Sequence, residues 1–176
     1  ADKLTGGSGD DTLYGGSGND SLTGNSGLNQ LYGGDGNDTI EAYFGADTVY
    51  GGSGADSIYN TALDVVYGGD GNDTVVGYAL YSHADTVYGG SGDDNLDGGH
   101  GNDLVYGGAD NDKIRAYHGF DTVYGGSGDD SIYAVESDLI YGGDGNDTVV
   151  GATGGAWTDT VYGGAGNDNL DGGGGA

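Results

Sequence analysis

The sequence predicts an all-β repeat fold in which many short strands stack around one thin core. The first observation is a nine-residue phrase that fills almost the whole chain and is clearest in residues 33–41, 68–76 and 142–150. The second is the eighth position of the phrase, which is Leu, Ile or Val in all eighteen units. One short strand cannot bury its single inward side chain alone, so the units must stack to share a core.

Each unit consists of a turn followed by a strand. The turn holds the first six positions, which read Gly-Gly-Asp-Gly-Asn-Asp in residues 33–38, and its glycines permit backbone angles with φ > 0. Positions seven to nine form the strand, with the eighth side chain inward and its two neighbours outward. The inward residues are Leu13, Leu22, Leu31, Ile40, Val49, Ile58, Val66, Val75, Val87, Leu96, Val105, Ile114, Val123, Ile132, Ile140, Val149, Val161 and Leu170.

Composition limits what such a chain can bind. The net charge is −26, so like charges oppose compaction and something cationic should neutralise them. An acidic surface repels the phosphates of nucleic acid, and no apolar run approaches the length needed to insert across a membrane. Cysteine is absent, so no disulfide framework exists. No Ser or Lys has a convincing base partner by spacing, which predicts that the chain is not an enzyme.

The phrase matches the pattern Gly-Gly-x-Gly-x-Asp-x-apolar-x, and over all 176 residues the chain resembles the RTX (repeats-in-toxin) calcium-binding family. The resemblance implies a right-handed parallel β-roll, which is a β-helix solenoid with two nonapeptide units per coil. Eighteen units would then give about nine coils. It also implies that the protein is secreted or displayed at the cell surface.

We expect residues 1–176 to form a single solenoid that is an excerpt of a longer one. Residues 2–5 read as positions six to nine of a preceding unit, and residues 172–176 begin another unit. Residues 33–97 and 107–171 align at an offset of 74 residues, with short and long units in matching places. The chain therefore contains a duplicated block of four coils.

Alternate turns differ from one another, and in a roll they fall on opposite edges. The turns of the irregular edge are degraded, as in residues 42–47 and 116–121, or changed in length, as in residues 60–67 and 77–88. On the other side, the regular edge, eight of nine turns keep the full glycine pattern. The regular turns are Gly15–Asp20, Gly33–Asp38, Gly51–Asp56, Gly68–Asp73, Gly89–Asp94, Gly107–Asp112, Gly125–Asp130, Gly142–Asp147 and Gly163–Asp168.

The resemblance implies calcium sites between consecutive regular turns. Calcium takes six to eight oxygen ligands, and a glycine-rich turn exposes several carbonyls beside its sixth-position carboxylate. Nine consecutive turns make eight intervals, so about eight Ca²⁺ are expected in one file along the regular edge. The implied carboxylate ligands are Asp20, Asp38, Asp56, Asp73, Asp94, Asp112, Asp130, Asp147 and Asp168, with Asp2 from the preceding unit. Extra calcium oxygens are expected from Asp35, Asp70, Asp144, Asp11 and Asp103.

The irregular edge is rich in aromatic residues, and few or no ions are expected there. The aromatic side chains either cover the edge or bind a partner, since exposed apolar patches often mark contacts. His100 and His118 are eighteen residues apart and should be neighbours, but a zinc site needs more than two ligands. The aromatic residues are Tyr43, Phe44, Tyr78, Tyr81, Tyr117, Phe120 and Trp157.

The ninth position before every regular turn is tyrosine, and these side chains should point outward and line up from coil to coil. One interpretation is a tyrosine ladder that stiffens the sheet by stacking. The other is a flat Tyr/Thr recognition face for ice, a glycan or another protein, including self-association. Val65, Leu104 and Leu139 interrupt the threonine file beside the tyrosines. The ladder residues are Tyr14, Tyr32, Tyr50, Tyr67, Tyr88, Tyr106, Tyr124, Tyr141 and Tyr162.

Three functions stay open at this point. The first is a calcium-folded structural module of a secreted RTX exoprotein, used as a stalk, adhesin or surface layer or as an aid to type I secretion. Such a module would stay disordered in low calcium and fold outside the cell. The second is a ligand-binding solenoid that uses the Tyr/Thr face. The third is the non-catalytic C-terminal region of a secreted protease or lipase.

Overall fold

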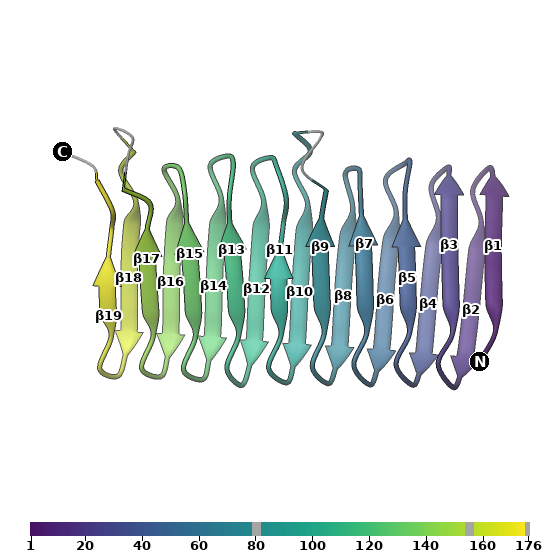
Figure 1. Cartoon of the computed structure of the whole chain (residues 1–176), viewed down its shortest axis with the longest axis horizontal. Helices are drawn as coiled ribbons and strands as arrows, with labels where there is room; N and C mark the ends of the chain where they lie inside the picture. The colour runs from purple at the N-terminus through teal and green to yellow at the C-terminus, as the bar shows by residue number, and fades with distance from the viewer. Residues whose placement is uncertain (79–81, 154–156, 175–176) are drawn as a thin grey trace.

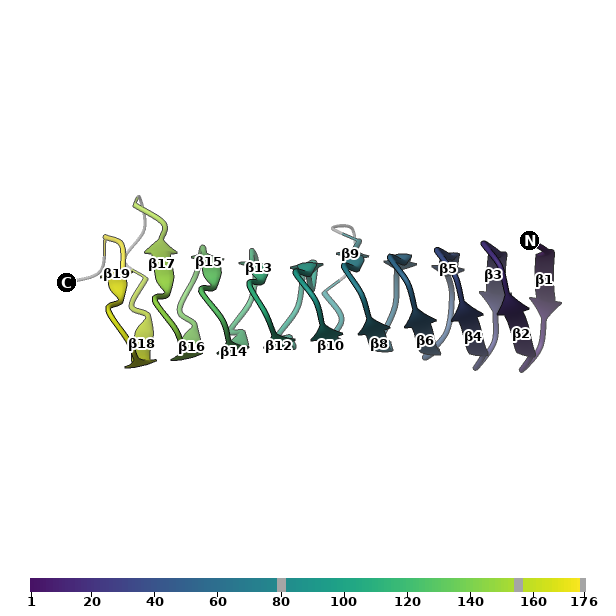
Figure 2. The same cartoon turned by 90° about the horizontal axis from the view of Figure 1, so that it is seen from below.

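A computed structural model describes residues 1–78, 82–153 and 157–174. Within these ranges the chain is all-β and winds into a solenoid whose coils each contribute one strand to each of two parallel sheets (Figures 1 and 2). This confirms the predicted parallel solenoid of about nine coils. No helix in the described ranges has the length and apolar character needed to cross a membrane.

The tyrosine sheet carries the ninth-position tyrosines and has nine strands in the described residues. Its strands are β2 (Thr12–Ser17), β4 (Gln30–Asp35), β6 (Thr48–Ser53), β8 (Val65–Asp70), β10 (Thr86–Ser91), β12 (Leu104–Ala109), β14 (Thr122–Ser127), β16 (Leu139–Asp144) and β18 (Thr160–Ala165). The sequence predicts strands of three residues, but these have six. The difference arises because the second glycine and third residue of each turn keep the parallel register, as in Gly34↔Gly52 and Asp35↔Ser53.

The variable sheet has ten strands in the described residues, and most of them are shorter. They are β1 (Lys3–Ser8), β3 (Ser21–Ser26), β5 (Thr39–Ala42), β7 (Ser57–Asn60), β9 (Thr74–Gly77), β11 (Asn95–Asp97), β13 (Lys113–Ala116), β15 (Ser131–Ala134), β17 (Thr148–Gly151) and β19 (Asn169–Asp171). In Figure 1 the regular turns form the lower edge of the solenoid, and the irregular turns form the upper edge.

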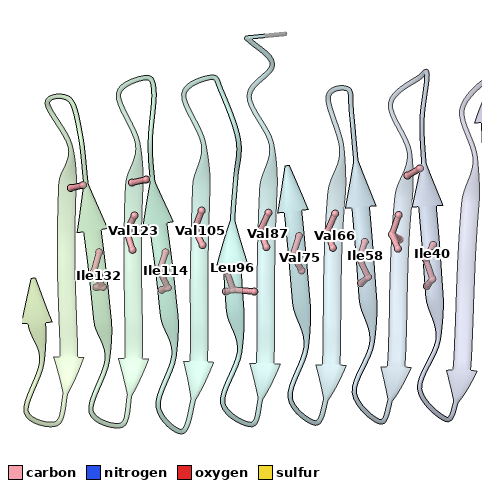
Figure 3. Close-up of a cluster of buried hydrophobic side chains, with 14 of the residues drawn as sticks. Ile40, Ile58, Val66, Val75, Val87, Leu96, Val105, Ile114, Val123 and Ile132 are labelled. Carbon is pink, nitrogen blue, oxygen red and sulfur yellow. The ribbon is translucent and has the colours of Figure 1, made fainter. Parts of the chain in front are cut away.

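The core is a single layer of aliphatic side chains between the two sheets (Figure 3). Every eighth-position residue from Leu22 to Val149 is at most 1% exposed, which confirms the predicted inward set over these coils. Leu13 and Val161 pack against this cluster and are partly buried. Because each coil supplies only two such side chains, a coil depends on its neighbours for its stability.

The ninth-position tyrosines stack ring on ring along the outside of the tyrosine sheet. Neighbouring ring centroids lie 4.8–5.0 Å apart, and the planes of neighbouring rings differ by 1–12°. The stack follows from the register, because each tyrosine pairs with a tyrosine, as in Tyr88↔Tyr106. Inside the stack each ring covers the faces of its neighbours, whereas the terminal rings of Tyr14 and Tyr162 are more than half exposed.

Replacing Tyr88 and Tyr106 together by Thr should destabilise the roll. The double change removes three ring contacts, each worth about 0.5–1.5 kcal/mol, so we expect a loss of about 1.5–4.5 kcal/mol in unfolding free energy. Thermal melting in saturating calcium measures the loss. The control is Thr at Tyr59, which holds the same ninth position in the variable sheet and pairs there with Glu41 and Val76. An equal loss for each tyrosine replaced would show that stacking is not the cause.

Candidate metal sites on the two edges

The sixth-position aspartates of the regular edge form a continuous file of hydrogen bonds from coil to coil. The backbone N–H of each aspartate donates to carboxylate Oδ1 of the aspartate in the following coil, as Asp20 does to Asp38 at 2.7 Å. From Asp20 to Asp168 the N···Oδ1 distances are 2.7–3.1 Å. The tight register of the strands on either side sets this spacing, so each carboxylate is fixed by one of its two oxygens.

The second oxygen of these carboxylates is buried and lacks a hydrogen-bond partner among the described residues. It lies beside the Cα of the first glycine of its turn. A Cβ added to Gly51, for example, would lie 2.4 Å from Asp56 Oδ2 and 2.5 Å from the carbonyl oxygen of Gly68 in the next coil. A Cβ would therefore collide with both oxygens, so only glycine fits here, and we call this position without a side chain the glycine gap. The unpartnered Oδ2 atoms of the regular edge belong to Asp20, Asp38, Asp56, Asp73, Asp94, Asp112, Asp130 and Asp147.

An unpartnered carboxylate oxygen next to a backbone carbonyl suits a hard cation such as calcium. In the described residues no three acidic or histidine side chains converge on one point. A bound cation would therefore take most of its ligands from carbonyls, and calcium accepts carboxylate and carbonyl oxygens together. The regular edge thus fits the calcium that the sequence implies, with one buried carboxylate and the carbonyls of two adjacent turns at each interval.

Burial and crowding raise the pKa of these carboxyl groups. Desolvation is the largest cause, the backbone N–H of the preceding aspartate opposes it, and neighbouring carboxylates add to it. The pKa of Asp73 and that of Asp112 rise to about 7, and those of Asp94 and Asp130 rise to about 6. Without a cation, Asp73 and Asp112 therefore stay partly protonated near neutral pH, and a cation must displace those protons.

The irregular edge carries a second file of the same kind. Its N···Oδ1 distances are 2.7–3.0 Å, and the file passes through Asn29 where an aspartate is missing. Sequence reasoning did not place Asp64 and Asp138, both buried, at the sixth position of their turns. The signal was present, because each stands two residues before an inward aliphatic residue, Val66 and Ile140 respectively.

The two edges differ at the glycine gap. On the irregular edge the first turn position holds Ala42, Ala116 or Ala134 in three coils, so a methyl group stands where the regular edge has only a glycine hydrogen. In a fourth coil the position holds Asn60, whose side-chain amide donates to Asp85 Oδ2 at 2.8 Å and so occupies an oxygen that a cation would need. Asp47 and Asp138, whose turns begin with Ala42 and Ala134, keep a buried Oδ2 without a partner among the described residues. How many ions each edge binds stays a prediction.

Most of the remaining predicted ligands are less buried than the aspartates of the regular edge. Asp2 is exposed, and its N–H donates to Asp20, while Asp168 is half-buried at the far end of the file. On the irregular edge Asp103 is buried in the second file and Asp11 is half-buried. The third-position residues Asp35, Asp70 and Asp144 are all exposed. Asp35 and Asp70 each accept a hydrogen bond from a serine hydroxyl in the next coil.

The aromatic side chains of the irregular edge do not seal it. Phe44 and Phe120 are more than 60% exposed, Tyr78 and Trp157 are also exposed, and Tyr43 and Tyr117 are half-buried. Tyr81 lies outside the described residues. Phe44, Leu63 and His83 are among the residues that line a shallow groove of about 520 Å³. Binding of a partner at this edge remains a prediction.

His100 and His118 are neighbours on the irregular edge, as the sequence predicts. Their backbones form a parallel bridge, and the ring centroids lie 4.4 Å apart. His118 Nδ1 also lies 3.2 Å from Glu136 Oε1. The described residues offer no group of three metal-binding side chains here, and a structural zinc site takes four ligands.

Fold and site together define a parallel β-solenoid with repeated oxygen-lined gaps between its turns. A family model, the RTX calcium-binding nonapeptide repeat, matches residues 1–31, 23–58, 61–79, 81–114, 106–134, 136–155 and 152–176. The chain belongs to this RTX family and is a calcium-binding repeat module. No curated protein matches the chain.

Without calcium, the folded state should be more stable near pH 5 than near pH 8. The folded pKa values of about 6 to 7 lie above the unfolded value of 3.8, so the folded chain binds more protons than the unfolded chain between these limits. This stabilisation is complete below the unfolded pKa and is lost as the pH rises through the folded one. Circular dichroism of the calcium-free chain measures the difference as a larger β signal near pH 5 than near pH 8. A chelated roll that gains stability toward pH 8 would contradict the expectation.

Changing Asp130 to Asn should weaken calcium binding more than changing Asp121 to Asn. Both side chains are buried, and both accept the N–H of the preceding coil's aspartate through Oδ1, which Asn preserves. Asp130 faces the glycine gap at Gly125, whereas the turn of Asp121 begins with Ala116. Titration calorimetry should show the loss of roughly one site in the first variant and little change in the second. Equal losses would mean that both edges bind calcium alike.

Proposed function

We propose that this chain is a calcium-folded structural module of a secreted or cell-surface protein, without catalytic activity of its own. It is disordered where calcium is scarce and becomes a stiff β-roll where calcium is plentiful. In that form it serves as a stalk, adhesin or surface-layer segment, or it assists secretion of the protein that carries it. RTX repeats are typical of secreted proteins, which supports this location.

The observation that carries the proposal is the row of eight buried, unpartnered Oδ2 atoms on the regular edge of a chain with net charge −26. Buried carboxylates that lack partners oppose folding, because each must be protonated or paired. A divalent cation in each interval would supply the missing partner and reduce the charge. Metal binding then contributes directly to the free energy of folding, since the unfolded chain has no preformed site.

The thin core is a second reason to expect that folding depends on calcium. Each coil buries two aliphatic side chains from its eighth positions, and the chain has no cysteine with which to cross-link its coils. Small cores of this kind usually need a metal or a disulfide for stability. Calcium is therefore the natural staple for a chain that must withstand conditions outside the cell.

The tyrosine sheet offers less support for the alternative of a glycan-binding or ice-binding face. A sugar that stacks on an aromatic side chain needs an open ring face, but ladder rings inside the stack cover one another at 4.8–5.0 Å. Open faces occur at the ends of the ladder. The threonine file beside the ladder is interrupted at Val65, Leu104 and Leu139. These features favour a structural role for the ladder.

Calcium should convert the chain cooperatively from a disordered state to a β-rich one. The expected result is a coil-like circular dichroism spectrum in EGTA and a β spectrum at millimolar Ca²⁺. Magnesium at equal concentration is the control, because it has the same charge but demands a smaller octahedral site. A folded spectrum that persists in EGTA near pH 8 would refute calcium as the staple. Equal folding in magnesium would show that neutralisation of the negative charge, and not a site that fits calcium, drives folding.

A further inference from the structure

The tyrosine ladder brings nine phenol side chains into one uninterrupted column. Of the fifteen tyrosines in the chain, nine are in the ladder and six are outside it. Every ladder ring is nearly parallel to its neighbours, and the strand register keeps like atoms opposite like atoms. The ortho carbons of adjacent rings are therefore separated by about the centroid spacing of 4.8–5.0 Å.

This arrangement suits oxidative coupling of phenols. Removing one electron and one proton from a phenol gives a radical whose unpaired spin lies partly on the carbons ortho to the oxygen. In the ladder such a radical has another phenol directly above or below it. Ladder rings inside the stack are half-buried, so their faces are shielded while their edges stay in contact with solvent. An oxidising enzyme can take an electron through the exposed edge of a ring, but water has little access to the space between two rings.

We propose that the tyrosine ladder is a site of oxidative cross-linking, in which tyrosines of adjacent coils join as dityrosine. The oxidant is a peroxidase with hydrogen peroxide. Two phenols each lose one electron and one proton, and the two radicals form a carbon–carbon bond between their ortho carbons. Each of those carbons then releases its hydrogen as a proton while a phenol oxygen regains one. The net loss of two hydrogen atoms per bond reduces one hydrogen peroxide to two waters.

The geometry makes the reaction selective for neighbouring coils. Ladder partners stand 17 to 21 residues apart in the sequence, as Tyr50, Tyr67 and Tyr88 do, so each bond would tie one coil to the next. Outside the ladder, Tyr117 and Tyr133 are close, but their rings meet edge to face at 70° with centroids 6.1 Å apart. Their ortho carbons are not held in register, so this pair is a built-in comparison.

Such bonds would give the roll the covalent links that its sequence otherwise lacks. The chain has no cysteine, and its coils are held together by hydrogen bonds, a thin core and the ladder itself. A bond between coils restricts the unfolded chain, as a disulfide does, and therefore raises the temperature of unfolding. The oxidised roll should melt at a higher temperature in calcium than the untreated roll.

The experiment treats the dilute, calcium-loaded chain with peroxidase and hydrogen peroxide. Dityrosine fluorescence and a monomer mass lowered by two hydrogens per bond are expected, and peptide mapping should place the bonds between adjacent ladder tyrosines. The test variant replaces every second ladder tyrosine by Phe, which keeps the ring stack but puts the remaining phenols two coils apart. Its residues are Tyr32, Tyr67, Tyr106 and Tyr141. This variant should lose the intramolecular product and the rise in melting temperature.

A control variant with the same number of changes tests whether the product depends on the ladder or only on the number of tyrosines. It replaces four tyrosines outside the ladder by Phe and should form as much intramolecular dityrosine as the unaltered chain. The changed residues are Tyr43, Tyr59, Tyr117 and Tyr133. Bonds that map outside the ladder, or a product of equal yield in the alternate-Phe variant, would overturn the proposal, as would bonds formed only between molecules. The test does not depend on calcium being the staple, because it requires only the stacked roll.

Discussion

Parallel stacking in register places each side chain beside its counterpart in the next coil, and the rest of the structure follows from this constraint. For Leu, Ile and Val the arrangement is favourable, since like shapes fill one narrow core. For tyrosine it produces stacked rings with centroids 4.8–5.0 Å apart. For aspartate it is unfavourable, because equal charges meet in a buried row. The sites on the two edges are the consequence, since protons or cations must occupy them.

Much of this architecture could be predicted because the repeat fixes the register. The aliphatic eighth position of each nine-residue unit identified the core from Leu22 to Val149. The alternation of regular and irregular turns distinguished the two edges. The length of the tyrosine-sheet strands was not predicted, because glycine pairs were interpreted as turn alone. Asp64 and Asp138 were not predicted because their turns have lost the glycine pattern that identifies the other aspartates. Their distance from the next inward residue, not their glycines, defines their place.

The edges show how one substitution can separate structure from binding. Both files of aspartates have the same hydrogen bonds and similar burial, so the backbone does not require glycine at the first turn position. Ala116 occupies that position on the irregular edge, and Gly107 occupies it on the regular edge. Retention of glycine throughout the regular edge is therefore explained by the close approach of the carboxylate Oδ2 and of the next coil's carbonyl oxygen, which leave no room for a Cβ. Sequence alone shows the glycine, but only the fold shows which oxygens approach it.

The hydrogen bonds of the aspartate files all run in one direction along the solenoid. Each aspartate N–H is satisfied by the carboxylate of the coil that follows it, and each regular glycine gap is closed by the carbonyl of that same later coil, as Gly33 does for Asp20. The backbone also bonds the coils in the opposite sense, since residues that start strands, such as Thr39, donate their N–H to the carbonyl oxygen of an aspartate in the preceding coil, here Asp20. Asp38 therefore bonds the coil before it through its carboxylate and the coil after it through its N–H and its carbonyl oxygen. One residue thus joins three coils, so a change at such an aspartate loosens its coil from both neighbours.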